Sequence, residues 1–258
     1  PEQLQAVLNL PVLGVVPSFL AEVGLEKDFA AKTASFASSL SEKKDDAGIA
    51  EKEDRPFVTI SAPRSFATES YRVIRTAILL SSADNPPKTL LVTSAKKGEG
   101  KTTFILNLAA ALSQAGSKTL VVDADLRRPS VGRYFSIPSR TAGLADFLAG
   151  MKELDEVLRS TPIDRLFIIP AGSEVPNPAE LIGSRKMAEL LRQLAEQYDY
   201  VLVDTPPVLP ATDAVSLSHA VDGVVLVVRG HVTVKHMARQ AALRLKQVNA
   251  RILGVVLN

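Results

Sequence analysis

The sequence predicts an α/β fold in which helices cover both faces of a doubly wound, mostly parallel sheet. From Pro56 onward, apolar runs of strand length alternate with amphipathic segments of helix length, which is typical of a parallel sheet buried on both faces. A glycine-rich segment lies directly between one such strand and the next helix. With 258 residues, 46% of them apolar, the chain can bury one sizeable core.

The expected strands are apolar and rich in Val, Ile and Leu, and each is followed by a segment with helical periodicity. The strands are Thr89–Thr93, Thr119–Asp123, Leu166–Pro170, Tyr200–Asp204, Val224–Val228 and Ile252–Leu257. The helices are Glu69–Ser81, Lys101–Ala115, Ser184–Tyr198, Asp213–Ala220 and Val234–Val248. This alternation predicts three α/β/α layers, with the ligand site beyond the carboxyl ends of the strands.

The first 55 residues differ from the rest. Residues 1–17 form a short apolar piece that two prolines and a glycine interrupt, so it cannot be a long helix. Ser, Ala, Lys and acidic residues dominate from about Ser18 to Arg55, a composition typical of a solvated linker. We therefore expect a segment and linker over 1–55 and a folded domain over 56–258. The start at Pro1 leads us to expect an excised fragment.

Composition excludes several classes of protein. The 30 basic and 28 acidic residues nearly cancel, so no strong field points to nucleic acid as a partner. No cysteine is present, which excludes disulfides, thiolate metal sites and a cysteine nucleophile. No apolar run reaches the roughly 18 residues that a membrane-spanning helix needs, and we expect this chain to be soluble.

The most specific motif is a phosphate-binding loop at Ser94–Thr103. It matches G-x-x-x-x-G-K-[ST] except that Ala95 replaces the first glycine. Glycines let the backbone N–H groups face inward, and the following helix adds its positive end. Lys101 is expected on the β- and γ-phosphates and the Thr102 hydroxyl on Mg²⁺. The nucleotide-contacting residues are predicted to be Ala95, Lys96, Lys97, Gly98, Glu99, Gly100, Lys101, Thr102 and Thr103.

Three aspartates end two predicted strands. Asp123 and Asp125 follow one buried strand and Asp204 ends another, and in a doubly wound sheet those ends converge on the phosphate crevice. Mg²⁺ prefers such hard oxygen ligands. A carboxylate not used by the metal is available to accept a proton. Taken singly, each aspartate is also explained as a turn or helix-cap residue.

These motifs together resemble the bacterial tyrosine kinases of capsule and exopolysaccharide export. The loop, D-x-D-x-R at Asp123–Arg127 and D-x-P at Asp204–Pro206 look like the family's Walker A, A′ and B motifs. Glu69, Arg72 and Arg75 reproduce the family's E-x-x-R-x-x-R helix. On residue pattern alone, that helix is equally a solvated charged face.

The resemblance implies a P-loop NTPase fold that binds ATP and Mg²⁺ and transfers the γ-phosphate to a tyrosine hydroxyl. It implies that Thr102, Asp123 and Asp204 hold the metal, and that Lys101 and the three aspartates form the catalytic set. Asp125 is the candidate for orienting or deprotonating the tyrosine. Arg127 is expected at the cofactor, although the sequence leaves open whether it faces phosphate or a carboxylate.

The resemblance also implies a setting. Glu69, Arg72 and Arg75 are expected to dock on a neighbouring subunit and build a ring whose members phosphorylate a tyrosine-containing tail in trans. Residues 10–17 resemble the family's juxtamembrane stretch, which implies tethering to the cytoplasmic face of the bacterial inner membrane, next to export machinery.

Several features depart from the family or remain open. The family's C-terminal tyrosine cluster is absent: only Tyr71, Tyr134, Tyr198 and Tyr200 are present, and Tyr71 is either an internal phosphorylation site or a packing residue. Lys96 occupies the place of the signature lysine of ParA/MinD-type ATPases, or is a solvent-facing lysine. Asn258 either meets the adenine edge or caps the last strand.

Two other functions remain open on the sequence. One is a ParA/MinD-like ATPase that dimerises over ATP. The other is a non-catalytic scaffold in which ATP assembles subunits. The polymer exported and the number of subunits cannot be read from the sequence.

Overall fold

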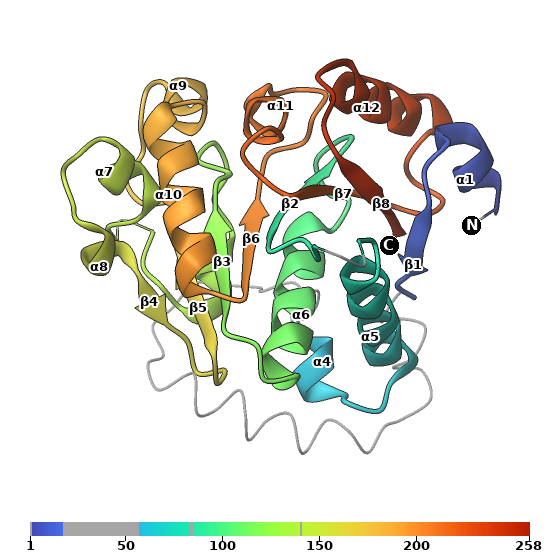
Figure 1. Cartoon of the computed structure of the whole chain (residues 1–258), viewed down its shortest axis with the longest axis horizontal. Coiled ribbons are helices and arrows are strands. Elements are labelled where there is room, and N and C mark those ends of the chain that lie inside the picture. Colours follow the sequence, from blue (N-terminus) through green and yellow to red (C-terminus); the bar gives the residue numbers. More distant parts are fainter. Residues whose placement is uncertain (1, 18–56, 83–84, 140) are drawn as a thin grey trace, which may run out of the picture.

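The computed structural model describes residues 2–17, 57–82, 85–139 and 141–258, so the predicted linker over 18–55 lies outside the described residues. In the described part, eight strands form one sheet in the order β1-β8-β7-β2-β6-β3-β5-β4. All neighbouring strands are parallel except β4 and β5. The predicted doubly wound α/β architecture is confirmed (Figure 1).

The six predicted strands all form, within one residue of their predicted ends. The strands are β1 Val12–Val15, β2 Thr89–Ser94, β3 Thr119–Asp123, β4 Arg159–Ser160, β5 Leu166–Ile169, β6 Tyr200–Asp204, β7 Gly223–Val228 and β8 Ile252–Leu257. The helices are α1 Glu2–Leu8, α4 Val58–Ser61, α5 Phe66–Leu79, α6 Lys101–Gln114, η3 Val131–Phe135, α7 Leu144–Leu148, α8 Leu154–Val157, α9 Pro178–Ile182, α10 Arg185–Gln197, α11 Asp213–Leu217 and α12 Lys235–Gln247.

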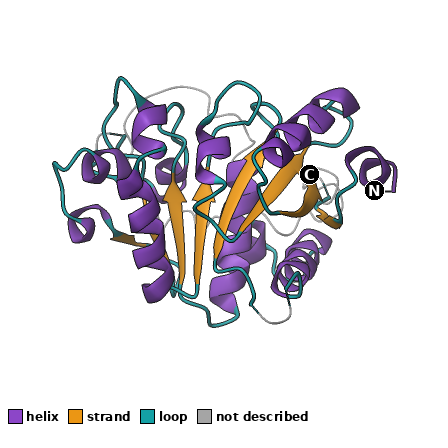
Figure 2. Ribbon diagram, turned by 45° about the horizontal axis from the view of Figure 1, so that its top comes forward, coloured by secondary structure: helices purple, strands orange, loops and turns teal. Residues whose placement is uncertain are grey.

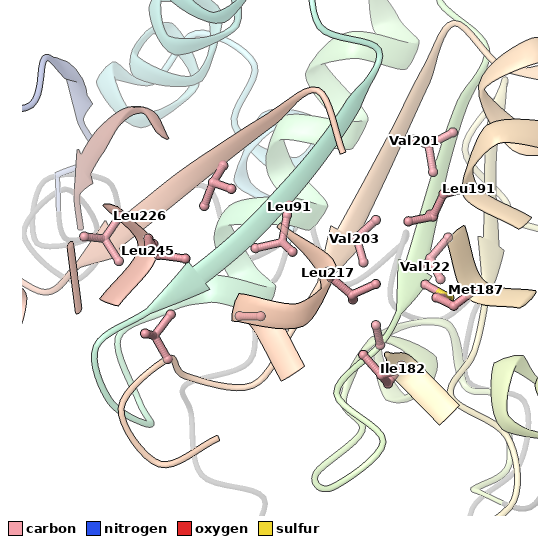
Figure 3. Packing of buried hydrophobic residues seen from close by; sticks show 14 of the residues in the cluster. Leu91, Val122, Ile182, Met187, Leu191, Val201, Val203, Leu217, Leu226 and Leu245 are labelled. Carbon is pink, nitrogen blue, oxygen red and sulfur yellow. The ribbon is translucent and has the colours of Figure 1, made fainter. Parts of the chain in front are cut away.

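Helices cover both sides of the sheet (Figure 2), and the strands bury side chains on both. Leu90 and Val92 of β2 pack in the cluster that α5 and α6 complete, whereas Leu91 between them points to the opposite cluster. That second cluster joins the sheet to α10, α11 and α12, and Figure 3 shows its members around Leu91. Alternation along a strand thus explains the unbroken apolar runs of the sequence.

Strand β1 was not predicted, because two prolines and a glycine seemed to interrupt its segment. Pro11 and Pro17 in fact bracket the strand, and β1 is an edge strand that pairs only with β8 (Figure 1), where proline costs no ladder hydrogen bond. Gly14 is required by packing, because a Cβ there would lie 2.4 Å from Cγ1 of Ile74 on α5. The strand therefore belongs to the sheet of the folded domain, although it lies within residues 1–55.

Helix α5 begins three residues before its predicted start, at a Ser65 N-cap whose side chain accepts the Thr68 N–H. Its Tyr71 is 1% exposed and stacks on Phe104 of α6 with 5.9 Å between ring centroids. Burial also raises the pKa of the Tyr71 hydroxyl. Of the two alternatives for Tyr71, its burial supports the packing role, because a kinase could reach the hydroxyl only if α5 left the core.

Candidate active site

The phosphate loop links β2 to α6. Gly98 and Gly100 adopt the left-handed conformation, with φ of 83° and 87°, which only glycine adopts without strain. A Cβ at Gly100 would also lie 1.9 Å from Asn258 Nδ2. No side chain caps the N-terminus of α6, which begins at Lys101, so its first N–H groups are available to an anion.

A pocket of about 710 Å³ opens over this loop. Its lining joins the loop to the segments after β3 and β6: Lys97, Gly98, Gly100, Lys101, Thr102, Thr103, Asp125, Arg127, Arg128, Ser130, Arg133, Tyr134, Pro206, Pro207, Pro210 and Ala211. Seven predicted nucleotide residues line this pocket, as does Asp125. Lys101 is only 8% exposed, and its positive charge lowers the pKa of both Asp125 and Asp204, against the effect of burial.

Asp204 is the carboxylate best prepared for a cation. Its Oδ2 accepts the Thr102 hydroxyl at 2.7 Å, and Thr102 Oγ1 is also 2.9 Å from Ser130 Oγ. Asp204 Oδ1 is buried and has no hydrogen-bond partner, an arrangement that is costly unless a ligand completes it. Burial raises the pKa of Asp204 to about 6, against the opposing effects of Lys101 and Thr102. These oxygens fit Mg²⁺, which prefers one or two carboxylates together with waters and phosphate oxygens.

Asp123 lies beside Asp204, since the two residues are partners in the β3–β6 register. Its Oδ2 accepts the N–H groups of Ser130 and Val131, both at 3.0 Å. Burial, and then the neighbouring Asp204, raise the pKa of Asp123 well above its ordinary value. Asp123 does not line the pocket, so its visible contacts shape the loop that follows β3.

Asp125 does line the pocket. Its Oδ1 accepts the Arg128 N–H at 3.0 Å, which fixes the carboxylate at the turn after β3. Burial raises the pKa of Asp125, and Lys101 opposes that rise. A carboxylate held in a pocket with a raised pKa is suited to accept a proton from a bound hydroxyl group.

Arg127 faces a carboxylate. Its Nε lies 3.2 Å from Oδ2 of Asp213, the buried first residue of α11. The pair ties the segment after β3 to α11, and Arg127 also lines the pocket.

Four predicted nucleotide residues lie outside the pocket lining. Ala95 and Glu99 are fully buried. Lys96 Nζ donates to the Val232 carbonyl at 3.2 Å, and Asn258 Nδ2 donates to the Glu99 carbonyl at 3.0 Å. The side chains of Lys96 and Asn258 are thus engaged in contacts within the subunit.

The three charged side chains of the E-x-x-R-x-x-R helix make contacts within the subunit. Glu69 and Arg72 form an ion pair three residues apart, and Arg72 also donates to the Pro63 carbonyl at 3.2 Å. Arg75 Nη1 donates to the Ala111 carbonyl in the last turn of α6 at 2.8 Å. Arg75 therefore supports the helix that carries the phosphate loop.

Some pocket residues had no signal in the sequence. Ser130, Arg133 and Tyr134 belong to no quoted motif, and only the turn of the chain through η3 brings them to the pocket. Pro206 is the last residue of the D-x-P motif, and Arg128 and Pro207 each follow a motif residue directly in the sequence.

The described residues contain neither a membrane-spanning helix nor a cluster of metal-binding side chains. Between residues 2 and 258, leaving out the gaps given above, no helix has the length and apolarity to cross a membrane. In the same ranges, no three His, Cys, Asp or Glu side chains are grouped so that they would hold a metal ion.

Comparison with known proteins decides the family. Residues 87–252 match the family profile AAA_31, described as an AAA domain. The chain is 37% identical to tyrosine-protein kinase YwqD of Bacillus subtilis over 204 residues, covering 79% of this chain and 86% of that protein. It is 34% identical to the putative tyrosine-protein kinase CapB of Staphylococcus aureus, covering 79% of this chain and 89% of that protein. The chain belongs to the bacterial tyrosine kinases.

Solved structures agree with this assignment. The chimerical protein CapA2B2 superposes with a TM-score of 0.81 at 32% identity, covering 100% of this chain and 97% of that one. The kinase domain of Escherichia coli ETK superposes with a TM-score of 0.82 at 27% identity, covering 100% and 93%. Our expectation of a bacterial tyrosine kinase domain is confirmed.

The relation to ParA/MinD-type ATPases is more distant. MinD of Pyrococcus horikoshii, complexed with Mg-ADP, superposes with a TM-score of 0.57 at 29% identity over 66% of this chain and 70% of that one. The P-loop NTPase fold is shared.

Proposed function

We propose that this domain transfers the γ-phosphoryl group of ATP to the hydroxyl of a protein tyrosine. The observation that supports this most strongly is the arrangement of Thr102 and Asp204, which leaves a buried carboxylate oxygen without a partner beside the phosphate loop. Asp125 lies in the same pocket. Asp204 does not line the pocket itself but accepts a hydrogen bond from Thr102, which does. A cation site, an anion cradle and a proton acceptor that adjoin one another are what phosphoryl transfer to a hydroxyl requires.

The loop and Lys101 would hold the triphosphate. Inward N–H groups from the loop and the positive end of α6 bind its oxygens, while Lys101 adds a charge that its burial makes strong. Thr102 and Asp204 would hold Mg²⁺, which when bound neutralises charge on the phosphates. These residues do little covalent chemistry. They position the reactants and stabilise charge.

Asp125 and Asp123 would have different roles in the reaction. Asp125 would accept the proton of the tyrosine hydroxyl, since it lines the pocket. Asp123 would keep the segment at Ser130 and Val131 in place and, next to Asp204, would help hold Mg²⁺. Arg127, paired with Asp213, would fix the turn that carries Asp125.

We extend the proposal to the setting that the family resemblance implies. The domain would assemble into a homo-oligomeric ring through the helix that carries Glu69, Arg72 and Arg75. It would phosphorylate a tyrosine-containing tail in trans and act with export machinery for exopolysaccharide or capsule at the cytoplasmic face of the inner membrane. Arg72 is 41% and Glu69 55% exposed, which leaves both accessible to a neighbour. Residues 1–55 would hold the juxtamembrane segment and linker, except that β1 (Val12–Val15) adds an edge strand to the sheet of the catalytic domain over 56–258.

The decisive experiment incubates the domain, joined to its natural tail, with labelled ATP and Mg²⁺, and detects phosphotyrosine. Lys101→Met is expected to abolish the label. Lys88→Met, at the exposed amino end of β2, is the matched control and keeps it. Steady phosphate release without phosphotyrosine, sensitive to Lys96→Ala, would instead establish a ParA/MinD-like ATPase. A change of oligomer size with ATP in light scattering, without either reaction, would establish a scaffold.

A further inference from the structure

Glu99 is a buried acidic residue inside the phosphate loop. It is 0% exposed and does not line the pocket. One carboxylate oxygen accepts the Lys96 N–H at 3.0 Å, and the other accepts the Thr233 hydroxyl. A buried carboxylate is costly unless it is well paired, so a glutamate at the tip of a glycine-rich loop requires a reason.

Further contacts tie the same loop to the segment between β7 and α12, which we call the anchor segment (Arg229–Thr233). Arg229 Nη1 donates to the Gly98 carbonyl at 3.1 Å, and the Thr233 hydroxyl accepts the Arg229 N–H at 3.2 Å. Asn258 closes the arrangement, because it donates to the Glu99 carbonyl and its own carbonyl accepts the Gly230 N–H at 2.8 Å. Neither the anchor segment nor Asn258 lines the pocket, so these contacts hold the loop from behind.

From this geometry we infer that Glu99 and Thr233 are positioning residues that set the phosphate loop in its anion-binding shape before nucleotide arrives. The bond from Lys96 N–H to Glu99 spans the loop's turn, and the Thr233 bond fixes that carboxylate to the anchor segment. A loop held in this way loses little conformational freedom on binding, whereas a free loop must be ordered at the cost of affinity. The inference rests on the nucleotide-binding role proposed above.

The test compares Thr233→Val with Thr233→Ser. Valine keeps the shape of threonine but cannot donate to Glu99, while serine keeps the hydroxyl. We expect Thr233→Val to weaken MgATP binding in calorimetry about ten-fold, or about 1.4 kcal/mol, which is near the upper end of the net contribution of a typical hydrogen bond. The KM for ATP should rise by the same factor with kcat nearly unchanged, and Thr233→Ser should bind MgATP like the parent.

Thr161→Val is the matched control. Thr161 also uses its hydroxyl for a backbone contact, to the Leu166 carbonyl at 2.9 Å, but at the β4–β5 edge of the sheet. It should leave nucleotide affinity unchanged. Equal MgATP affinity in Thr233→Val and the parent, or an equal loss in Thr233→Ser and Thr233→Val, overturns the inference. Absence of MgATP binding by the parent protein would instead refute the proposed function.

A second pair of variants tests the loop itself. Glu99→Gln retains an acceptor for the Lys96 N–H and an amide that can bond Thr233, so we expect it to keep most of the affinity. Glu99→Ala removes both contacts and should weaken MgATP binding by at least as much as Thr233→Val. It should also expose the loop to limited proteolysis in the absence of nucleotide. An alanine variant with parental affinity and parental protease resistance contradicts the positioning role.

Discussion

Replacing Asp204 with asparagine should stabilise the nucleotide-free domain while it destroys the cation site. Burial raises the Asp204 pKa from its ordinary 3.8 to about 6. At about 1.4 kcal/mol per pKa unit, holding this carboxylate ionised in the fold costs about 3 kcal/mol at pH 7.5. Asparagine removes the charge and keeps an oxygen that can accept the Thr102 hydroxyl. Its NH₂ group then takes the place of Asp204 Oδ1, where no partner is present among the described residues. An unpaired amide costs about 1–2 kcal/mol, so we expect a net gain of about 1–2 kcal/mol.

The sign of the pH dependence follows from the direction of the same pKa. Between about pH 4 and pH 6 the folded protein keeps the Asp204 proton that the unfolded chain has lost, so the contribution of this group to stability falls as pH rises through that window. Asp204→Asn should remove this fall. Urea unfolding followed by circular dichroism at pH 5 and pH 7.5, for both proteins, measures it directly.

Two further arms sharpen this prediction. MgATP should stabilise the parent, by about 2.7 kcal/mol at a hundred times its Kd, and should not stabilise Asp204→Asn. Asp222→Asn is the control, because Asp222 is an exposed carboxylate that accepts the Lys88 and Thr89 N–H groups at the far end of β2, and we expect no gain there. If Asp204→Asn were less stable than the parent at pH 7.5, or kept the same pH slope, our account of the buried carboxylate would be refuted.

Three other changes test particular contacts. Arg75→Ala should lower the free energy of unfolding by about 1 kcal/mol, because the hydrogen bond to the Ala111 carbonyl is lost. Urea denaturation measures this difference, and an unchanged midpoint would show that the contact contributes nothing. Gly100→Ala should abolish nucleotide binding in calorimetry, because φ is 87° and the new Cβ would lie 1.9 Å from Asn258 Nδ2; parental affinity would contradict the loop geometry. Tyr71→Phe should leave the phosphotyrosine yield unchanged, since Tyr71 is buried against Phe104, and loss of label in peptide mapping would restore Tyr71 as an acceptor.

Much of the fold was readable from local patterns. Strands β2, β3 and β6 are continuous apolar runs that end in polar residues, and the loop after β2 carries glycines where φ must be positive. Such signals lie within a few residues of one another, so no long-range contact is needed to see them. Strand β1 was missed because its pairing partner, β8, lies at the other end of the chain.

The residues of the candidate site were also predictable from the sequence in part only. Lys101, Thr102, Asp125 and Asp204 were found from motifs and do lie together, because parallel strands end at one edge of the sheet. The sequence did not tell Asp123 from Asp125. That distinction depends on which carboxylate the backbone of Ser130 and Val131 folds over.

By itself, then, the sequence determined the fold class, the phosphate loop and the set of carboxylates at the sheet edge, since periodicity and short motifs record local backbone requirements. Only the tertiary structure decided that Arg127 pairs with Asp213, that Tyr71 is buried, and that Glu99 faces Thr233 rather than the pocket. Where a side chain points depends on the segments packed around it, and those lie tens to more than a hundred positions away along the chain.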